Sequence, residues 1–411
     1  MSRVVFIGLS AYGHINPTLS IVKELILRGE EVIYIASNKY KNLVSSLGCK
    51  HVEFKYSKLL FGSHHLSSKT QRTESEFLSS IKQFYASMES QRILANKLKQ
   101  LIQSLSADYI IHDSTMFYVK YICDELQIPC ISSITLFALN EAMFVKSKTL
   151  LSDFYSVDLK NTPQFVVDCI KQIELENYLK VGYKHSYLDN SMTKQGLNIV
   201  YTSKEFQPYS ELLDNSYHFA GNNLQYRKTL EIKQDYNLPK GKKVILISFG
   251  SIMSSNKDLV GFYSQMMKYF SKYDATFILN IGNLDKAIFD FVPENFILKN
   301  GINQLELLCL SDLFITHGGM NSVSEAIQLN APMIVIPKAM DQFLVAEQVE
   351  KTGVGQIIKK DNIDFNELES LSSKILKNSN YSKNTERIAD TYRSTGEEKV
   401  TVDKIFEYVK K

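Results

Sequence analysis

The chain has 411 residues, which is longer than one ordinary hydrophobic core supports, so we expect two domains of roughly 200 residues each. A hydrophobic fraction of 44% with 22% charged residues is typical of a globular protein and excludes a disordered chain. The formal net charge of +3 is too near zero to indicate a nucleic-acid partner or binding to an anionic membrane surface.

The first half of the chain alternates strand and helix patterns. The apolar, β-branched run Val4–Leu9 predicts a strand, Pro17–Arg28 has apolar residues at helical spacing, and Glu31–Ala36 predicts a second strand. This order is a βαβ unit, whose strands should be parallel. The same alternation recurs as a strand, a helix and a strand at Ala107–His112, Met116–Leu126 and Ile128–Ile134.

The second half repeats this alternation, which predicts two α/β domains with parallel sheets. Its strands are expected at Lys243–Phe249, Ala275–Ile281, Asp312–Thr316 and Met333–Ile336, and its helices at Leu259–Tyr269 and Ser322–Leu329. The segment from about 206 to 242 lacks clear periodicity and therefore suits a linker. We predict a first domain over 1–215, a linker over 216–242, a second domain over 243–390 and a C-terminal helix within 391–411.

The segments 55–92 and 137–184 read as helical insertions rich in Phe and Tyr, outside the minimal sheet pattern. Long excursions from a rigid α/β scaffold often carry substrate contacts. The alternative, that they only pack against the first domain, stays equally open.

The five cysteines are an odd number, widely spaced and without a CxxC pair, which argues against a disulfide framework and against a structural zinc site. No metal ligand set is predicted, because the adjacent His64 and His65 lack a cluster of partners. The sequence contains neither the apolar stretch of a secretory signal nor the ~20 apolar residues of a membrane span, so we expect a cytoplasmic protein.

The first glycine turn, GLSAYGHI at 8–15, has the GxxxxG spacing of a phosphate-binding loop. Such a loop needs Lys and Ser or Thr after the second glycine, where this chain has His14 and Ile15. His14 is instead a candidate general base, because a neutral imidazole accepts a proton near physiological pH. Asp113, after a predicted strand, is the preferred carboxylate to orient His14, and Asp108 and His112 in the same segment are the competing candidates.

The segment THGGMNS at 316–322 lies between a predicted strand and a predicted helix. Its glycines allow close approach of a ligand to the backbone, and the start of the helix offers N–H groups and a positive dipole end to an anion. The neighbouring side chains can donate to a diphosphate or bond sugar hydroxyls, and they are His317, Asn321, Ser322, Glu325, Asp341 and Gln342.

The segment DLFITHGGMNSVSEAIQLNAPMIVIPKAMDQFLVAEQV resembles the donor signature of family 1 glycosyltransferases, especially bacterial macrolide-type UDP-glycosyltransferases. The resemblance extends over the chain through GHINPTLSIVKEL, DYIIHDS, FQPYSELL and ISFGS. It implies the GT-B fold, with two Rossmann-like domains facing across a central cleft. It also implies that the C-terminal helix, from about Glu397, returns to brace the first domain.

The resemblance implies an inverting, metal-independent transfer of a hexose from a UDP-sugar to a small lipophilic acceptor. His14 would deprotonate the acceptor hydroxyl, and Asp113 would orient His14. The donor diphosphate would contact Ser251, His317, Gly319, Asn321 and Ser322, the ribose Glu325, and the hexose Asp341 and Gln342. The donor is a co-substrate, so no resident cofactor is expected, and the default oligomeric state is a monomer.

One segment departs from the family pattern. Relatives carry an aromatic-x-Pro-Gln segment whose ring stacks on uracil, whereas this chain has Gly301-Ile302-Asn303-Gln304. Gln304 is retained and the ring is missing, which predicts a weaker or altered preference for the base. Two other functions stay open: a GT-B enzyme that forms glycolipid or processes a sugar nucleotide, and a non-catalytic sugar-nucleotide-binding protein.

Overall fold

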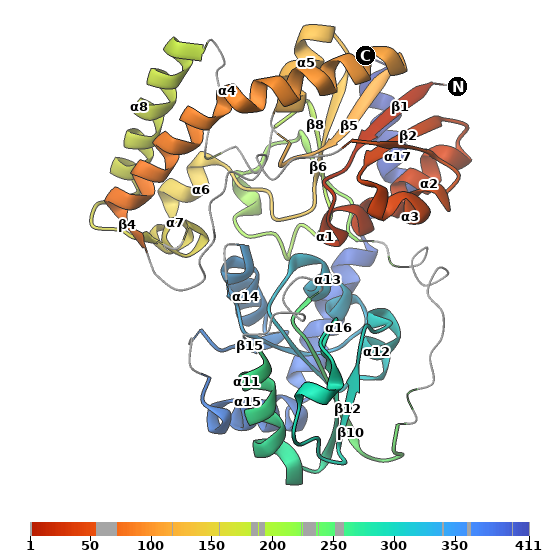
Figure 1. Cartoon of the computed structure of the whole chain (residues 1–411), viewed down its shortest axis with the longest axis vertical. Helices are drawn as coiled ribbons and strands as arrows, with labels where there is room; N and C mark the ends of the chain where they lie inside the picture. Colours follow the sequence, from red (N-terminus) through yellow and green to blue (C-terminus); the bar gives the residue numbers. More distant parts are fainter. Residues whose placement is uncertain are drawn as a thin grey trace. The chain divides into compact units, whose positions relative to one another are not determined.

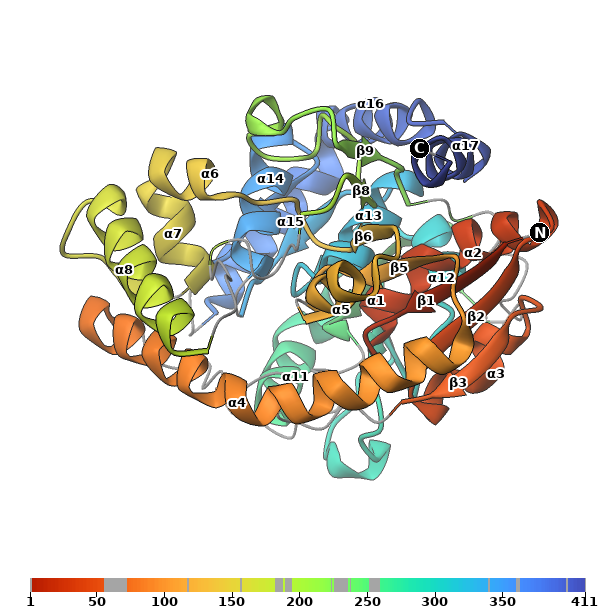
Figure 2. The same ribbon diagram turned by 90° about the horizontal axis from the view of Figure 1, so that it is seen from above.

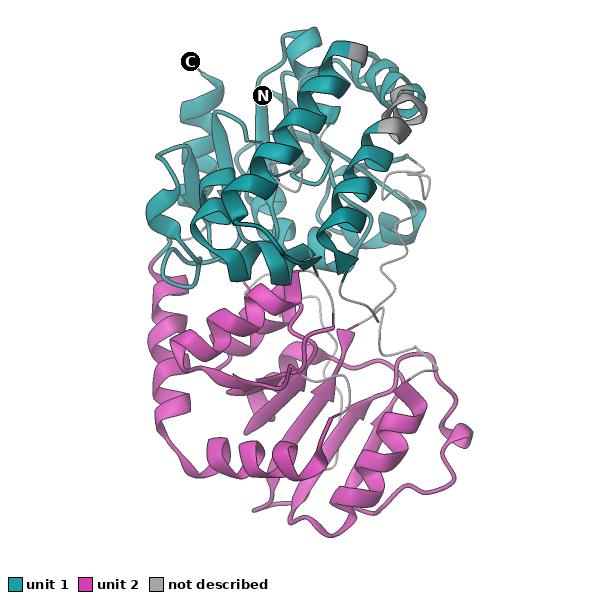
Figure 3. Ribbon diagram, turned by 90° about the vertical axis from the view of Figure 1, so that its left-hand side faces the viewer, with its two compact units in different colours: residues 1–223, 395–411 teal, residues 224–394 magenta. Residues whose placement is uncertain are grey.

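The computed structural model describes residues 2–54, 72–116, 118–155, 157–181, 188, 194–222, 224, 236, 238–250, 259–338, 341–359, 363–396 and 398–410. The chain divides into two compact units (Figure 3). Unit 1 comprises residues 1–223 and 395–411, and unit 2 comprises residues 224–394. Both ends of the chain therefore belong to unit 1, and each unit is described below by itself.

Unit 1 is built on a parallel sheet whose strand order is β3-β2-β1-β5-β6-β8-β9 (Figures 1 and 2). The central strands β5 and β6 are buried along their whole length, and each combines two isoleucines with polar residues that are also buried. The strands are β1 (Arg3–Ile7), β2 (Glu31–Ala36), β3 (Lys50–Glu53), β5 (Tyr109–Asp113), β6 (Cys130–Ile134), β8 (Leu197–Val200) and β9 (Tyr217–Phe219). The edge strand β9 occupies part of the region where the sequence suggested a linker.

The strand order of unit 1 reverses between β1 and β5. From β1 the chain builds outward through β2 and β3, and it then returns to place β5 on the other side of β1. In open parallel sheets, ligands bind at the carboxyl ends of the strands at this switch point. The two residues predicted to carry catalysis, His14 and Asp113, follow β1 and end β5 respectively.

The helices of unit 1 are α1 (Tyr12–Ile15), α2 (Leu19–Leu27), α3 (Lys41–Ser45), α4 (Glu74–Leu105), α5 (Tyr118–Leu126), α6 (Glu141–Lys146), α7 (Lys148–Tyr155), α8 (Pro163–Val181) and α17 (Glu398–Val409). The helix predicted at Pro17–Arg28 begins later, at Leu19, because Asn16–Thr18 form a separate 3-10 turn around Pro17. The long helix α4 packs against α8 and α5, and α6 also packs against α8 (Figure 2).

The last helix, α17, packs on unit 1 against α2 (Figures 1 and 2). Its apolar side chains Val402 and Ile405 are fully buried. At its edge, Arg28 Nη1 donates to Asp403 Oδ1 at 3.0 Å, and His218 Nε2 lies 2.9 Å from Thr401 Oγ1.

Unit 2 has a second parallel sheet, in the order β12-β11-β10-β13-β14-β15, with its own switch point between β10 and β13. Its strands are β10 (Lys243–Ser248), β11 (Ala275–Asn280), β12 (Phe296–Lys299), β13 (Leu313–Thr316), β14 (Met333–Val335) and β15 (Gly355–Ile357). Its helices are α11 (Leu259–Tyr269), α12 (Gln304–Leu310), α13 (Met320–Gln328), α14 (Asp341–Thr352), α15 (Phe365–Lys377) and α16 (Asn380–Arg393). Both units thus have the doubly wound Rossmann-like topology predicted from the alternation of patterns.

Within the described residues, no helix is both long enough and apolar enough to cross a membrane.

Candidate active site

His14 and Asp113 are in direct contact in unit 1. His14 lies on the short helix α1 that follows β1, and its Nδ1 is 2.8 Å from Asp113 Oδ2. The Asp113 side chain is only 2% exposed, whereas the His14 side chain keeps 16% of its surface exposed. The neighbouring positions of β1 and β5 in the sheet bring together these residues, which are far apart in the sequence.

The carboxyl group of Asp113 is held in its ionised form. Burial acts to raise the pKa of Asp113, but the charge and hydrogen bond of His14 and the hydrogen bonds from Thr115 outweigh it and leave that pKa below its ordinary value. Thr115 supplies its backbone N–H at 2.9 Å and its hydroxyl at 2.5 Å, both to Asp113 Oδ1. An ionised carboxylate can only accept, so the His14 proton facing it is on Nδ1. The lone pair of a neutral His14 ring is then on Nε2.

The two competing residues of the same segment have other partners. Asp108 Oδ2 accepts a hydrogen bond from the backbone N–H of Arg3 at 2.6 Å. His112 is buried, and its Nδ1 lies 2.9 Å from the carbonyl oxygen of Asp113. Of the three residues that the sequence left in competition, Asp113 is the one paired with the His14 side chain.

Thr135 is a residue of this site that sequence reasoning missed. Its Oγ1 lies 2.8 Å from His14 Nδ1, the same nitrogen that faces Asp113. Thr135 is buried and directly follows β6, the strand next to β5. A single threonine after a strand gives no signal in the sequence, and only the strand order brings it beside His14.

The predicted donor segment forms the turn between β13 and α13 in unit 2. Gly318 has a φ of +86°, in the left-handed region that favours glycine. Gly319 is the N-cap of α13, and because glycine has no side chain it cannot cap the N–H groups of the first turn. The start of this helix therefore has the backbone geometry of an anion site.

His317 lies against the backbone of two glycines. A Cβ atom at Gly250 would lie 2.7 Å from His317 Cε1, and a Cβ at Gly319 would lie 2.9 Å from Nε2, so neither position accepts a larger residue without a shift. The His317 ring keeps part of its surface exposed, yet the protein packed around it lowers the pKa of His317 to about 4. The ring is therefore neutral near pH 7 and has one N–H to donate.

Glu325, which is fully buried on α13, is hydrogen-bonded to other predicted donor residues. Its two carboxylate oxygens accept hydrogen bonds from Gln304 Nε2 at 2.6 Å and from Asn321 Nδ2 at 2.5 Å. Gln304 Nε2 also lies 3.1 Å from Ser322 Oγ. The structure thus brings four of the predicted donor residues into one hydrogen-bonded group.

Asp341 and Gln342 occupy the first turn of α14, after β14. Gln342 Oε1 accepts the backbone N–H of Lys338 at 2.9 Å. The backbone oxygen of Gln342 lies 3.4 Å from the position that a Cβ on Gly318 would take, which places this turn beside the glycines.

Ser251, His64 and His65 lie outside the described residues. Within the part of the chain that the structure describes, no group of three or more His, Cys, Asp or Glu residues could hold a metal ion.

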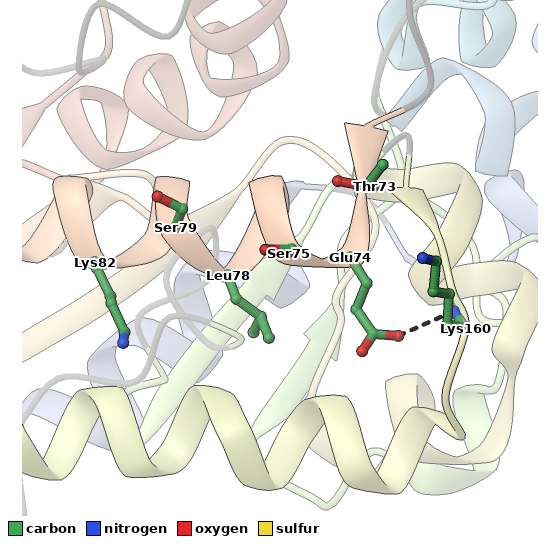
Figure 4. A pocket seen from close by; sticks show the side chains of 7 residues that line it. All are labelled: Thr73, Glu74, Ser75, Leu78, Ser79, Lys82 and Lys160. Carbon is green, nitrogen blue, oxygen red and sulfur yellow. Dashed lines mark hydrogen bonds between the residues drawn. The ribbon is translucent and has the colours of Figure 1, made fainter.

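A pocket of about 530 Å³ lies elsewhere in unit 1, at the start of α4 (Figure 4). Its lining residues are Thr73, Glu74, Ser75, Leu78, Ser79, Lys82 and Lys160, none of them a predicted site residue. Glu74 Oε2 accepts the backbone N–H groups of Lys160 at 3.0 Å and Asn161 at 2.9 Å. Glu74 thus joins the start of α4 to the turn before α8.

Known proteins match the chain over its whole length. It is 30% identical to the uncharacterized UDP-glucosyltransferase YojK of Bacillus subtilis, over 100% of this chain and 98% of that protein. The NDP-glycosyltransferase YjiC of Bacillus licheniformis is 26% identical over 88% of this chain and 86% of its own length. Residues 264–407 match the family model of the erythromycin biosynthesis protein CIII-like C-terminal domain.

A solved structure has the same fold. The calicheamicin glycosyltransferase CalG4 superposes with a TM-score of 0.77 at 20% identity, over 100% of this chain and 99% of that chain. This likeness confirms the GT-B fold predicted for the chain. The full-length match to YojK shows that the chain belongs to the family 1 glycosyltransferases, enzymes that transfer a sugar from a nucleotide sugar.

Proposed function

We propose that this glycosyltransferase moves glucose from UDP-glucose to a hydroxyl of a small lipophilic acceptor, such as a macrolide, a phenol or another natural product. The transfer inverts the anomeric configuration and requires neither a divalent ion nor a resident cofactor. The observation that carries this proposal is the pairing of His14 Nδ1 with Asp113 Oδ2 at 2.8 Å on a ring that keeps 16% exposure. The YojK relative, named a UDP-glucosyltransferase, supports the choice of donor.

In this mechanism, Nε2 of the neutral His14 ring removes the proton of the acceptor hydroxyl. The resulting oxygen attacks the anomeric carbon of the donor as the bond from that carbon to the UDP oxygen breaks. The electron pair leaves with UDP, and the proton stays on His14 as an imidazolium. Asp113 stabilises that cation, because its carboxylate is buried, ionised and in contact with Nδ1.

The leaving diphosphate carries the negative charge that develops, and unit 2 supplies groups suited to it. We assign the phosphates to the start of α13, to His317 and to Ser251, and the hexose to Asp341 and Gln342. The N–H groups and dipole of a helix start stabilise an anion without a metal ion. His317 acts here as a neutral donor, because its low pKa keeps the free ring uncharged at pH 7.

The assignment is tested by turnover of α-linked UDP-glucose with a panel of phenols, macrolides and sterols. We expect UDP release together with a β-glucoside, identified by the anomeric proton coupling, at the same rate with and without EDTA. An α-glucoside would disprove inversion, and loss of turnover in EDTA would disprove metal independence. If none of the acceptors yields a glucoside, the proposed activity is wrong.

The base of the donor is recognised less strictly than in relatives that have a stacking ring. The segment that carries the ring in relatives has Gly301 at its first position, which has no side chain to stack on a base. Asn303 of the same segment caps α12 by accepting the N–H of Glu306 at 3.1 Å, and its backbone N–H donates to the Tyr236 hydroxyl at 3.2 Å. The relative YjiC is named an NDP-glycosyltransferase, which agrees with a loosened preference. We expect kcat/KM to be similar for UDP-glucose and dTDP-glucose, with UDP-glucose ahead. A strong preference for dTDP-glucose would overturn the uridine assignment.

Replacing Thr135 with valine is expected to lower kcat by about three- to tenfold, the value of one net hydrogen bond. Valine keeps the volume of threonine and removes the oxygen that lies 2.8 Å from His14 Nδ1, so the ring loses one of the contacts that orient Nε2. Thr135→Ser, which keeps the hydroxyl, should stay within about twofold of the wild type. Equal rates for the valine and serine variants would show that the hydroxyl does not orient His14.

A further inference from the structure

His112, beside the catalytic pair, has a hydrogen-bond partner at each ring nitrogen. Nδ1 lies 2.9 Å from the carbonyl oxygen of Asp113, and Nε2 lies 3.2 Å from the side-chain amide nitrogen of Gln195. A carbonyl oxygen only accepts and an amide nitrogen only donates, so the ring proton is on Nδ1 and the lone pair is on Nε2. The ring therefore connects the amide of Gln195 to the main chain of Asp113 in one defined tautomer.

This ring stays neutral in the folded protein. Burial lowers the pKa of His112 to about 4, the positive charge of Lys120 acts in the same direction, and the contacts with Asp113 oppose both. The side chain is fully buried. A neutral ring with both nitrogens engaged is not available as a base for a substrate, and it can act only through the groups it holds.

Gln195 is itself fixed. Its backbone N–H donates to Asn198 Oδ1 at 2.8 Å, and its carbonyl oxygen accepts Asn198 Nδ2 at 2.9 Å. Asn198 lies on β8 and is in register with Ser132 of β6, which is in register with His112 of β5. The amide of Gln195, which donates to His112 Nε2, is thus held in place by the two hydrogen bonds between Gln195 and Asn198. Together with the carbonyl oxygen of Asp113 at Nδ1, it determines which His112 nitrogen carries the proton.

Asp113 is held at both its main chain and its side chain. Its carbonyl oxygen accepts the N–H of Met116 at 3.0 Å in addition to the His112 Nδ1–H, and its Oδ1 accepts from Thr115. These contacts leave Oδ2 directed at His14. A shift of about 1 Å in a group that orients a reacting centre can lower the rate about 10²-fold, so the main-chain position of Asp113 matters for catalysis.

We propose that His112 is a positioning residue of the transfer reaction: its Nδ1–H fixes the main chain of Asp113 and so directs the carboxylate at His14. The inference rests on the proposed function, because it assumes that His14 is the base. Its action is indirect, since the His112 ring itself contacts neither donor nor acceptor in this assignment.

Three substitutions at this position separate the two hydrogen bonds of the ring. In His112→Asn, the side-chain amide can place an N–H near the position of Nδ1. In His112→Gln, the amide instead lies near the position of Nε2, and His112→Phe keeps the ring shape and removes both bonds. We expect His112→Phe to lower kcat by about tenfold or more with an unchanged KM for UDP-glucose, and His112→Asn to recover most of that loss.

The pH profile of kcat/KM gives a readout that a purely structural role would not change. The negative charge of Asp113 favours the protonated ring of His14, so a displaced carboxylate favours the neutral ring. The acidic limb of the profile should therefore move to lower pH in His112→Phe and His112→Gln, and return in His112→Asn. If His112→Phe fails to fold, the difference in kcat and in the acidic limb between the Asn and Gln variants tests the proposal.

The outcomes separate this inference from the proposed function. Loss of turnover in His14→Ala supports the base assignment whatever the His112 variants do. If His14→Ala is inactive while the Phe and Gln variants keep the wild-type kcat and acidic limb, the positioning role is wrong and the base assignment stands. If His14→Ala turns over at the wild-type rate, both are wrong.

Discussion

Replacing His14 with alanine is expected to lower kcat by about 10²- to 10⁴-fold, the range of a positioned general base. The variant lacks the Nε2 lone pair that would remove the acceptor proton, and alanine offers no other base. His14 belongs to unit 1, whereas the residues assigned to the donor belong to unit 2, so the dissociation constant for UDP should stay unchanged. The measurements are single-turnover glucoside formation and calorimetric binding of UDP.

A double substitution tests whether Asp113 acts through His14. Asp113→Asn alone removes the charge that stabilises the imidazolium and should lower kcat substantially. His14→Ala combined with Asp113→Asn should lose no more than His14→Ala, because residues that act as one unit are not additive. His51→Ala is a matched control, since His51 is a partly buried histidine of β3 in the same unit. Additive losses in the double variant would give Asp113 a role of its own.

Replacing Glu325 with glutamine is expected to weaken UDP binding by about ten- to a hundredfold, the value of hydrogen bonds to a charged group. Glu325 is fully buried, and its oxygens accept N–H groups of Gln304 and Asn321, which shows that this carboxylate accepts from two donors at once. Two vicinal ribose hydroxyls would present the same pair of donors. Glutamine keeps the shape but replaces one acceptor with a donor.

The ligand itself separates a ribose contact from a structural effect. Wild-type protein should bind UDP more tightly than 2′-deoxy-UDP, and Glu325→Gln should lose most of that difference. Glu386→Gln provides a charge-matched control, because Glu386 is exposed on α16 of the same unit. If Glu325→Gln weakened both ligands equally, Glu325 would support the fold of the site and not hold the ribose.

The sequence predicts the strands and helices whose apolar residues recur at a clear period. The buried strand Glu31–Ala36 and the helix Leu259–Tyr269 have the predicted bounds in the structure. Short strands such as β9 and β15 were not predicted, because each has only a few residues and too little apolar repetition. The helix α13 begins at Met320 and not at the predicted Ser322, since Gly319 takes the N-cap position.

The candidate site was predictable where a motif has a local geometry. The turn at 316–322 is read from its glycines and the helix that follows, and Asp113 from its place at the end of a strand. The contacts of Thr135 and Gln195 could not be predicted. Thr135 is 121 positions from His14, and Gln195 is 83 positions from His112. Each pair meets only because of the order of strands in the sheet, which periodicity does not determine.

The return of α17 to unit 1 has a consequence for biosynthesis. The sheet of unit 1 is complete once β9 has been made, but the helix that covers α2 is synthesised only after all of unit 2. During translation, unit 2 therefore has its full sequence before unit 1 does, and the surface of α2 that α17 covers stays exposed until α17 has been made. A nascent chain stalled before residue 398 should expose this surface to chaperones, and release of the last residues should close it.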